Sequence, residues 1–174
     1  KSRAGLVAVS GPVLEFDVIV NLPKLKVHRM LGLSGAVKNH FGCVTSVWKA
    51  LLHLLLGDRS NHFESMLLDL LTLLPPSVSL LDAVTAMHVT GPVDGEPFFL
   101  NLLAASPSAV ALDTALYSLL HLSPPAVPLW QEALRRKIPG ANFKDLIFPL
   151  ASLESFDAAG FIIPPGLQPV GFHL

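Results

Sequence analysis

The polar side chains that could do chemistry gather in one stretch of the chain, residues 17–44. An apolar segment ends at Leu22, Pro23 breaks it, and basic side chains follow before a glycine-spaced segment that holds a serine, a lysine and an asparagine. Ammonium groups beside the unpaired N–H groups of a helix start attract anions. We therefore expect a site for a small anionic ligand, made of Lys24, Lys26, His28, Ser34, Lys38 and Asn39.

The start of a helix is the structural element that this site requires. Ser34 is its predicted N-cap, and Gly32 and Gly35 would let the backbone approach a ligand closely. The glycine spacing is not that of a Walker loop or of a dinucleotide fingerprint. A second interpretation is a turn whose lysines are solvated and whose serine only caps the helix, and the residues alone leave both interpretations open.

Read as NLPKLKVH followed by GLSGAVKNHFG, the same stretch resembles the signature of a family known as domain of unknown function 362. Further positions resemble this family between about residues 5 and 147. They lie in a helix, in a strand-end LLDAV segment, in a GP-x-x-G loop and in an S-x-P-x-A-x-D segment. The resemblance makes them secondary site candidates, except for the aspartate of LLDAV, which joins the main set. These residues are Lys49, His53, Asp82, Gly91, Gly95 and Asp113.

The resemblance implies a redox-associated domain of bacterial or archaeal type. Many members of the family carry a ferredoxin-like iron–sulfur module. The cysteine-rich module and the usual opening strand of the family are missing from this sequence, so the chain resembles a middle fragment of a longer protein. The implied iron–sulfur cluster would then sit in a separate segment of the parent protein, with no cofactor in this chain. The family has no settled activity to carry over.

Composition narrows the class of protein. The 174 residues suit one domain, and a net charge of −1 argues against nucleic-acid binding. Charged residues make up 14% of the chain, against about 25% in ordinary soluble domains. This low share predicts apolar surface that a homo-oligomer or the missing portions of the parent would cover, although an unusually large core is the alternative. The most apolar tract, residues 66–81, contains Asp69 and two prolines, so no membrane span is predicted.

Apolar segments and helical patterns alternate along the chain, which predicts an α/β domain over residues 1–174. Its sheet should be mainly parallel or mixed, with helices on its faces, and residues 160–174 should form an irregular tail rich in proline and glycine. The expected strands are Asp17–Leu22, Ser77–Ala83, Phe98–Ala105 and a segment near 146–150. One expected helix begins at Ser34. The other expected helices are Ser46–Leu56, a segment from Ser60 or Asn61 to Leu74, Ala109–Leu120 and Leu129–Lys137.

Ligands of such sheets bind beyond the carboxyl ends of the strands. Applied to the strands that end at Leu22 and Asp82, this rule places residues 23–28 and 84–96 at one edge of the sheet, where both segments could line one crevice. We therefore expect the basic side chains to face the segment from Asp82 to Gly95.

Other chemistries find little support. The seven histidines form no zinc motif; His28, His53 and Asp82 could hold a transition metal only if the fold joined them, so no metal is predicted. The one cysteine, Cys43, can neither form an internal disulfide nor hold a cluster, and we expect it to be a small buried side chain in a reducing, cytoplasmic setting. Asp113 is interpreted first as a capping or salt-bridging carboxylate. No nucleophile elbow or triad is present in the sequence.

Two hypotheses of different classes follow. The first is a redox-linked domain that binds a small anionic substrate or cofactor at its lysine-rich segment. The second is a non-catalytic module that docks an iron–sulfur electron-transfer partner, such as a ferredoxin-like module or protein. The sequence does not give the substrate, the electron donor or the direction of the reaction. It also does not give the oligomeric state or the targeting of the parent protein.

Overall fold

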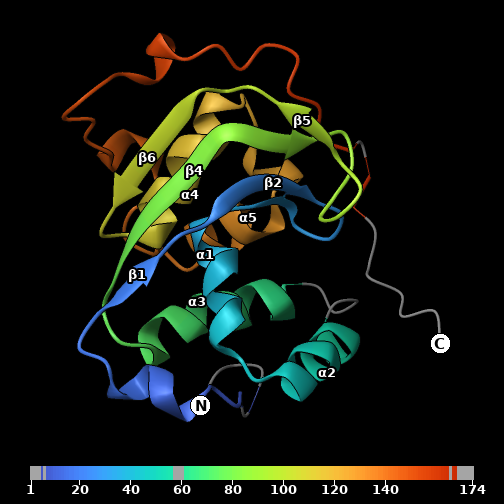
Figure 1. Cartoon of the computed structure of the whole chain (residues 1–174), viewed down its shortest axis with the longest axis vertical. Helices are drawn as coiled ribbons and strands as arrows, with labels where there is room; N and C mark the ends of the chain where they lie inside the picture. Colours follow the sequence, from blue (N-terminus) through green and yellow to red (C-terminus); the bar gives the residue numbers. More distant parts are fainter. Residues whose placement is uncertain (1–4, 6, 57–60, 165, 168–174) are drawn as a thin grey trace.

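One long strand, β4 (Ser77–His88), organises the fold (Figure 1). The computed structural model describes residues 5, 7–56, 61–164 and 166–167. Along one edge β4 pairs in parallel with β1 (Ile19–Asn21) and then with β2 (Lys24–His28). Along its other edge it pairs antiparallel with β6 (Leu102–Ser106) and β5 (Glu96–Phe98), and β3 (Gly32–Ser34) pairs antiparallel with β2. The predicted α/β class, with a mixed sheet, is confirmed.

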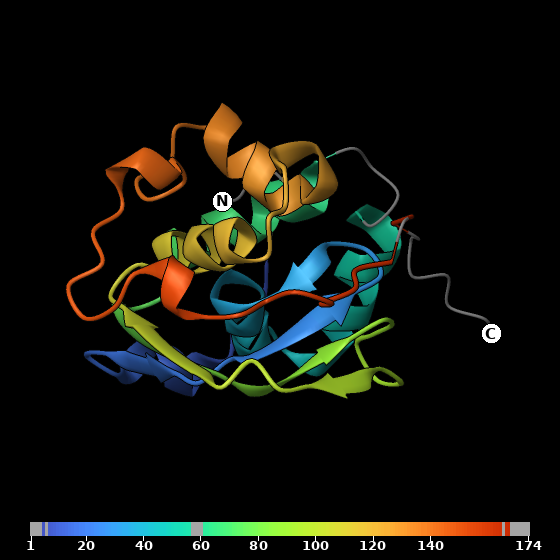
Figure 2. The ribbon, with the colours of Figure 1, turned by 90° about the horizontal axis from the view of Figure 1, so that it is seen from above.

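Helices cover one face of this sheet (Figure 2). They are α1 (Ala36–Asn39), α2 (Ser46–Leu56), α3 (His62–Leu73), α4 (Ala109–Leu119) and α5 (Pro128–Arg135). The 3-10 turns are η1 (Gly11–Glu15), η2 (His40–Cys43), η3 (Pro124–Ala126), η4 (Phe143–Asp145) and η5 (Leu153–Ser155). Alternate residues of β4, among them Leu81 and Ala83, are buried beneath the helices.

The other face of the sheet is open within the described part of the chain (Figure 2). Apolar side chains of three neighbouring strands are exposed there, which the strand alternation explains because their sequence neighbours point into the core. We call this surface the open sheet face; its residues are Val20, Val78, Leu80, Val84 and Leu103. Within the described part of the chain, the expected helices therefore lie on one face of the sheet (Figure 2).

The expectation that residues 23–28 lie beyond the end of a strand is wrong, because this segment is mainly strand β2 itself. Leu25 and Val27 alternate with polar residues and are fully buried, which is the period of a strand. Pro23 lies between β1 and β2, where its carbonyl accepts a hydrogen bond from the Asp82 N–H at 2.9 Å. The proline therefore separates β1 from β2, while both strands pair with the same edge of β4.

Several element boundaries differ from the expected ones. Ser34 lies in β3, and Gly35 takes the N-cap position of α1 without a side-chain bond, so the predicted N-cap is wrong. The predicted strand near residues 146–150 is irregular, and Ile147 and Leu150 are exposed. Gly57, which follows the predicted helix Ser46–Leu56, and Ser60, one of the two predicted starts of the next helix, lie outside the described residues.

The tail from Gly160 has no regular secondary structure where it is described, as predicted. It packs on the sheet: the Val89 N–H donates to the Ile162 carbonyl at 2.9 Å, and the Phe161 ring lies 5.3 Å from the Phe98 ring. The end of the tail, which includes His173, is outside the described residues.

Candidate functional site

Basic side chains from a strand and two helices gather near the β2–β3 hairpin. The charges of Lys26, Lys38 and His53 all lower the pKa of His28, and the charges of Lys26 and Lys49 lower the pKa of Lys38. Such coupling requires that the groups lie near one another. We call these five residues the basic cluster. It unites three members of the expected main site with two of the secondary candidates.

His28 is the most buried member of the basic cluster. Burial lowers its pKa most, the charges of Lys38, His53 and Lys26 add to the effect, and the resulting pKa is about 3. The Nδ1 atom accepts a hydrogen bond from the Met30 N–H at 3.3 Å. The ring is therefore neutral at pH 7 and carries its proton on Nε2, which makes Nε2 a hydrogen-bond donor.

Lys38 comes from α1, and its ammonium group is poorly solvated. Burial lowers its pKa first, the charges of Lys26 and Lys49 lower it further, and the resulting pKa is about 8. The Nζ atom lies 4.6 Å from the centre of the Phe41 ring, a cation–π distance. Phe41 was not predicted as a site residue, although its i+3 spacing from Lys38 on a helical turn could have shown it.

The imidazole ring of His53 contacts the backbone of α2 and two aromatic rings. Its Nδ1 lies 2.9 Å from the Lys49 carbonyl, which can only accept, so Nδ1 carries the proton and Nε2 is the acceptor of the ring. Its ring lies 5.1 Å from that of Phe41 and 4.7 Å from that of Phe63. Burial lowers the pKa of His53. The basic cluster thus combines lysine ammonium groups with two imidazoles that favour the neutral form.

The N-terminus of α1 is not available to an external anion, because Asp113 of α4 occupies it. Its Oδ1 accepts from the Ala36 N–H at 2.6 Å, and its Oδ2 accepts from the Val37 N–H at 3.0 Å. A Cβ atom at Gly35 would collide with this carboxylate, so the close approach requires glycine. Burial raises the pKa of Asp113 to about 7, against the effect of both N–H donors. These are the bonds of a capping carboxylate.

Three other expected site residues, Lys24, Asp82 and Asn39, have internal partners instead. The Lys24 Nζ forms an exposed ion pair with the Asp82 Oδ2 at 2.7 Å, and Asp82 also accepts from the Val84 N–H at 3.0 Å. Asn39 donates through Nδ2 to the Asn21 Oδ1 at 2.7 Å. The structure therefore brings neither Lys24 nor Asn39 into the basic cluster.

Ser34, Gly91 and Gly95 lie where packing of the backbone accounts for them. Ser34 is buried in β3, opposite Lys26 in the antiparallel ladder. A Cβ atom at Gly91 would collide with the Val27 carbonyl oxygen, and one at Gly95 would collide with the Thr90 carbonyl oxygen. Gly91 thus packs directly on the backbone of β2, and Gly95 packs on its own loop, so both glycines allow close backbone contacts. The expected strand end at Asp82 is wrong, because β4 continues to His88.

Metal binding finds no support in the side-chain positions. Among the described residues no group of three or more His, Cys, Asp or Glu side chains could hold a metal ion. The hypothetical set of His28, His53 and Asp82 is not assembled, because Asp82 is bound to Lys24 on an exposed surface. Cys43 is partly buried, and burial raises the pKa of its thiol.

Comparison with known proteins identifies relatives of this chain. Residues 3–118 match the family described as Domain of unknown function (DUF362). A thylakoid-associated protein of Synechocystis sp. (strain ATCC 27184 / PCC 6803 / Kazusa) is 36% identical over 166 residues, which cover 95% of this chain and 51% of that protein. The chain thus spans about half the length of the curated relative that it matches. No solved structure matches it significantly. None of the helices in the described part of the chain has the length and apolar character of a membrane span.

Proposed function

Because the chain belongs to the domain of unknown function 362 family, as its signature predicted, we propose that its basic cluster binds a small anionic substrate or cofactor. The observation that carries this proposal is that a strand and two helices hold cationic groups together. The Lys38 Nζ and the His53 ring both lie against the Phe41 ring, and the charges of Lys38 and Lys26 lower the pKa of the buried His28. The three ion pairs found among the described residues all lie outside the cluster. A bound anion would offset the repulsion that these groups now exert on one another.

The groups of the basic cluster suit a phosphate, sulfate or carboxylate. Lysine ammonium groups and the His28 Nε2–H can donate to anion oxygens, and charge-assisted bonds of this kind are stronger than neutral ones. The His53 Nε2 can accept, so a partly protonated anion such as a phosphate monoester could also donate one bond. The rings of Phe41 and Phe63 limit solvent on one side of His53, which reduces screening there.

The test of this proposal is the pH dependence of sulfate binding, because sulfate keeps its charge while Lys38 titrates. Since the pKa of Lys38 in the empty protein is about 8, this ammonium group is lost as the pH rises through that value. Sulfate affinity should fall about tenfold between about pH 7 and pH 9. Calorimetric titration at constant ionic strength measures it. A flat profile over this range would mean that Lys38 does not contact the anion.

The alternative function is a non-catalytic module that docks an iron–sulfur electron-transfer partner. The same positive charges would then face an acidic protein surface, and small anions would act only by screening. Sulfate and chloride at equal ionic strength separate the two functions. A specific site binds sulfate with saturation and chloride weakly, whereas a docking surface responds alike to both salts.

The redox role is a proposal that rests on the family resemblance. An iron–sulfur cluster does not fit the described residues, since the chain has one cysteine and such clusters ordinarily need four ligands, mostly thiolates. Any cluster that works with this site would therefore be supplied by a separate segment or protein. The thylakoid association belongs to the relative, and the cytoplasmic location of this chain stays a prediction.

We also propose that the open sheet face mediates self-association. Its apolar side chains surround the exposed Lys24–Asp82 pair, and two copies related by a twofold axis could exchange these charges while burying the apolar residues. Light scattering should show a dimer whose share rises with protein concentration. Leu80→Gln should reduce that share strongly, and Val47→Gln on α2 is the matched exposed control. A wild-type protein that stays monomeric at every concentration contradicts the proposal.

A further inference from the structure

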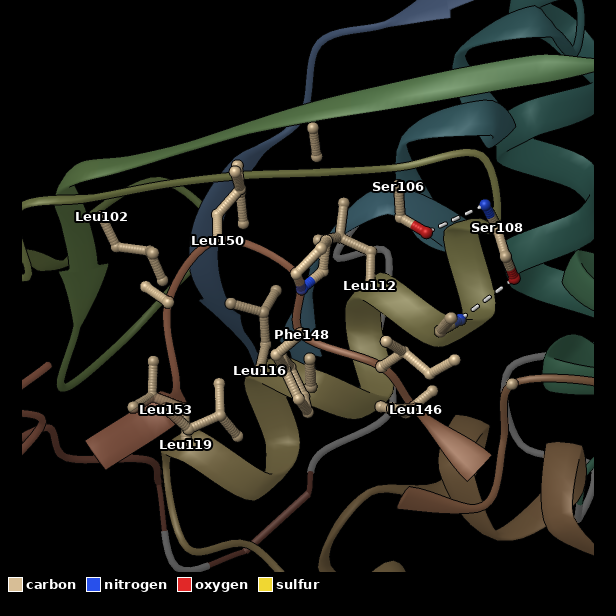
Figure 3. A pocket seen from close by; sticks show the side chains of 18 of the residues that line it. Leu102, Ser106, Ser108, Leu112, Leu116, Leu119, Leu146, Phe148, Leu150 and Leu153 are labelled. Carbon is tan, nitrogen blue, oxygen red and sulfur yellow. Dashed lines mark hydrogen bonds between the residues drawn. The ribbon is translucent and has the colours of Figure 1, made fainter. Parts of the chain in front are cut away.

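A cavity lies away from the basic cluster, between β6, α4 and the irregular segment that follows η4 (Figure 3). Its volume is about 460 Å³, which is within the range of small-molecule sites. We call it the apolar pocket. Strand β6 contributes Leu102, helix α4 contributes Leu116 and Leu119, and the irregular segment contributes Leu146 and Phe148.

Polar side chains at the apolar pocket are few, and the hydroxyls of its two serines each accept a backbone hydrogen bond. At one end the Ser106 Oγ accepts from the Ser108 N–H at 3.0 Å, and the Ser108 Oγ accepts from the Ala111 N–H at 3.2 Å (Figure 3). Asp145 is the charged residue of the lining, and no Lys, Arg or His is among the described residues that form it. Water would find few partners in such a space, and an anionic ligand would find no cation.

The outer wall of the apolar pocket is a strap of residues 146–152, which has neither helix nor strand and runs from η4 to η5. Leu150, a lining residue, is 98% exposed, and its neighbour Ile147 is 88% exposed. The pocket therefore opens to solvent beside apolar side chains. These side chains would lose water contact if an apolar molecule entered beneath the strap.

We propose that the apolar pocket is a binding site for an uncharged, apolar small molecule with an alkyl or aromatic body. Its size, its apolar lining, its serines that already accept hydrogen bonds and the single carboxylate at its wall all favour such an occupant over an ion or a fatty acid anion. This site is independent of the anion site proposed for the basic cluster. An apolar side chain from another protein segment is the competing occupant.

The neutral fluorescent probe N-phenyl-1-naphthylamine tests the proposal on the full chain. Its fluorescence should rise with saturation at one probe per protein, and decanol should displace it at least tenfold more effectively than decanoate. Ala115→Trp, which fills the pocket from α4, should weaken probe binding at least tenfold; Ala104→Phe on β6 does the same from the opposite wall. Ala50→Trp on α2, outside the lining, is the matched control and should bind as the wild type does.

The open sheet face could also attract an apolar probe, so Leu80→Gln is measured as well. Probe binding that survives Leu80→Gln and is lost in either pocket-filling variant supports the apolar pocket. Binding that follows Leu80, or that both pocket-filling variants retain, overturns the proposal. Absence of saturable binding of the probe and of decanol also overturns it and leaves a protein segment as the occupant.

Discussion

Replacing Lys38 by Met should weaken sulfate binding about tenfold to a hundredfold, since a charge-assisted contact contributes about 1.5–3 kcal/mol. The same change should raise the free energy of unfolding at pH 7. Methionine keeps much of the aliphatic stem over the Phe41 ring and removes an ammonium group that burial and the charges of Lys26 and Lys49 disfavour. Binding and stability should therefore move in opposite directions.

The pH dependence of the free energy of unfolding tests independently whether the charge of Lys38 destabilises the fold. Lys38 has a pKa of about 8 in the folded protein and 10.5 as the ordinary value, so between these values the unfolded chain binds more protons than the folded one. Wild-type stability should therefore rise with pH across this window, by at most about 3 kcal/mol from this group. Lys38→Met should lack this rise.

Lys24→Met is the matched control, because it removes the same charge from β2 at a side chain that is paired with Asp82 outside the basic cluster. It should bind sulfate nearly as the wild type does. Calorimetric titration and urea unfolding measure both quantities. Equal losses of sulfate affinity in the two variants would show that net charge, and not the basic cluster, controls binding.

Replacing Asp113 by Ala should lower the free energy of unfolding by about 2–4 kcal/mol, because it leaves two buried N–H groups without acceptors. The donors, on Ala36 and Val37, are shielded from water, so solvent cannot replace the carboxylate. The change should also weaken sulfate binding, since α1 positions Lys38. Urea unfolding measures the first effect, with Asp94→Ala at an exposed carboxylate as control.

Gly35→Ala should reproduce this defect without removing the carboxylate, since the new Cβ would displace the carboxylate from the helix start. Asp113→Asn reports the role of charge. The pKa of Asp113 is about 7 in the folded protein, above its ordinary value of 3.8, so this group stabilises the fold at low pH and loses that effect as the pH rises through about 7. The wild type should lose stability relative to Asp113→Asn over this range. A difference in stability between wild type and Asp113→Asn that stays constant with pH would contradict the raised pKa of Asp113. A Gly35→Ala protein as stable as the wild type would contradict the capping role.

The sequence by itself determined the elements whose signals are local. Period and caps located α2, α3 and α4 within a residue or two, and apolar runs located β1 and β4 as neighbours in one sheet of an α/β domain. The sequence also grouped Lys26, His28 and Lys38 as site candidates, with Lys49 and His53 as secondary ones, and the structure brings these side chains near one another. Lys26 and His28 could be recognised because they lie two residues apart in the sequence.

Only the tertiary structure decided which of those residues have internal partners. Asp113 lies 76 residues from Val37 in the sequence, and no local pattern shows that its carboxylate fills the helix start that was expected to bind a ligand. Lys24 was grouped with Lys26 by spacing, but the pairing of β2 with β4 places it beside Asp82. Long-range strand pairing and helix packing set these contacts, because a buried donor or charge takes whichever partner the fold brings within reach.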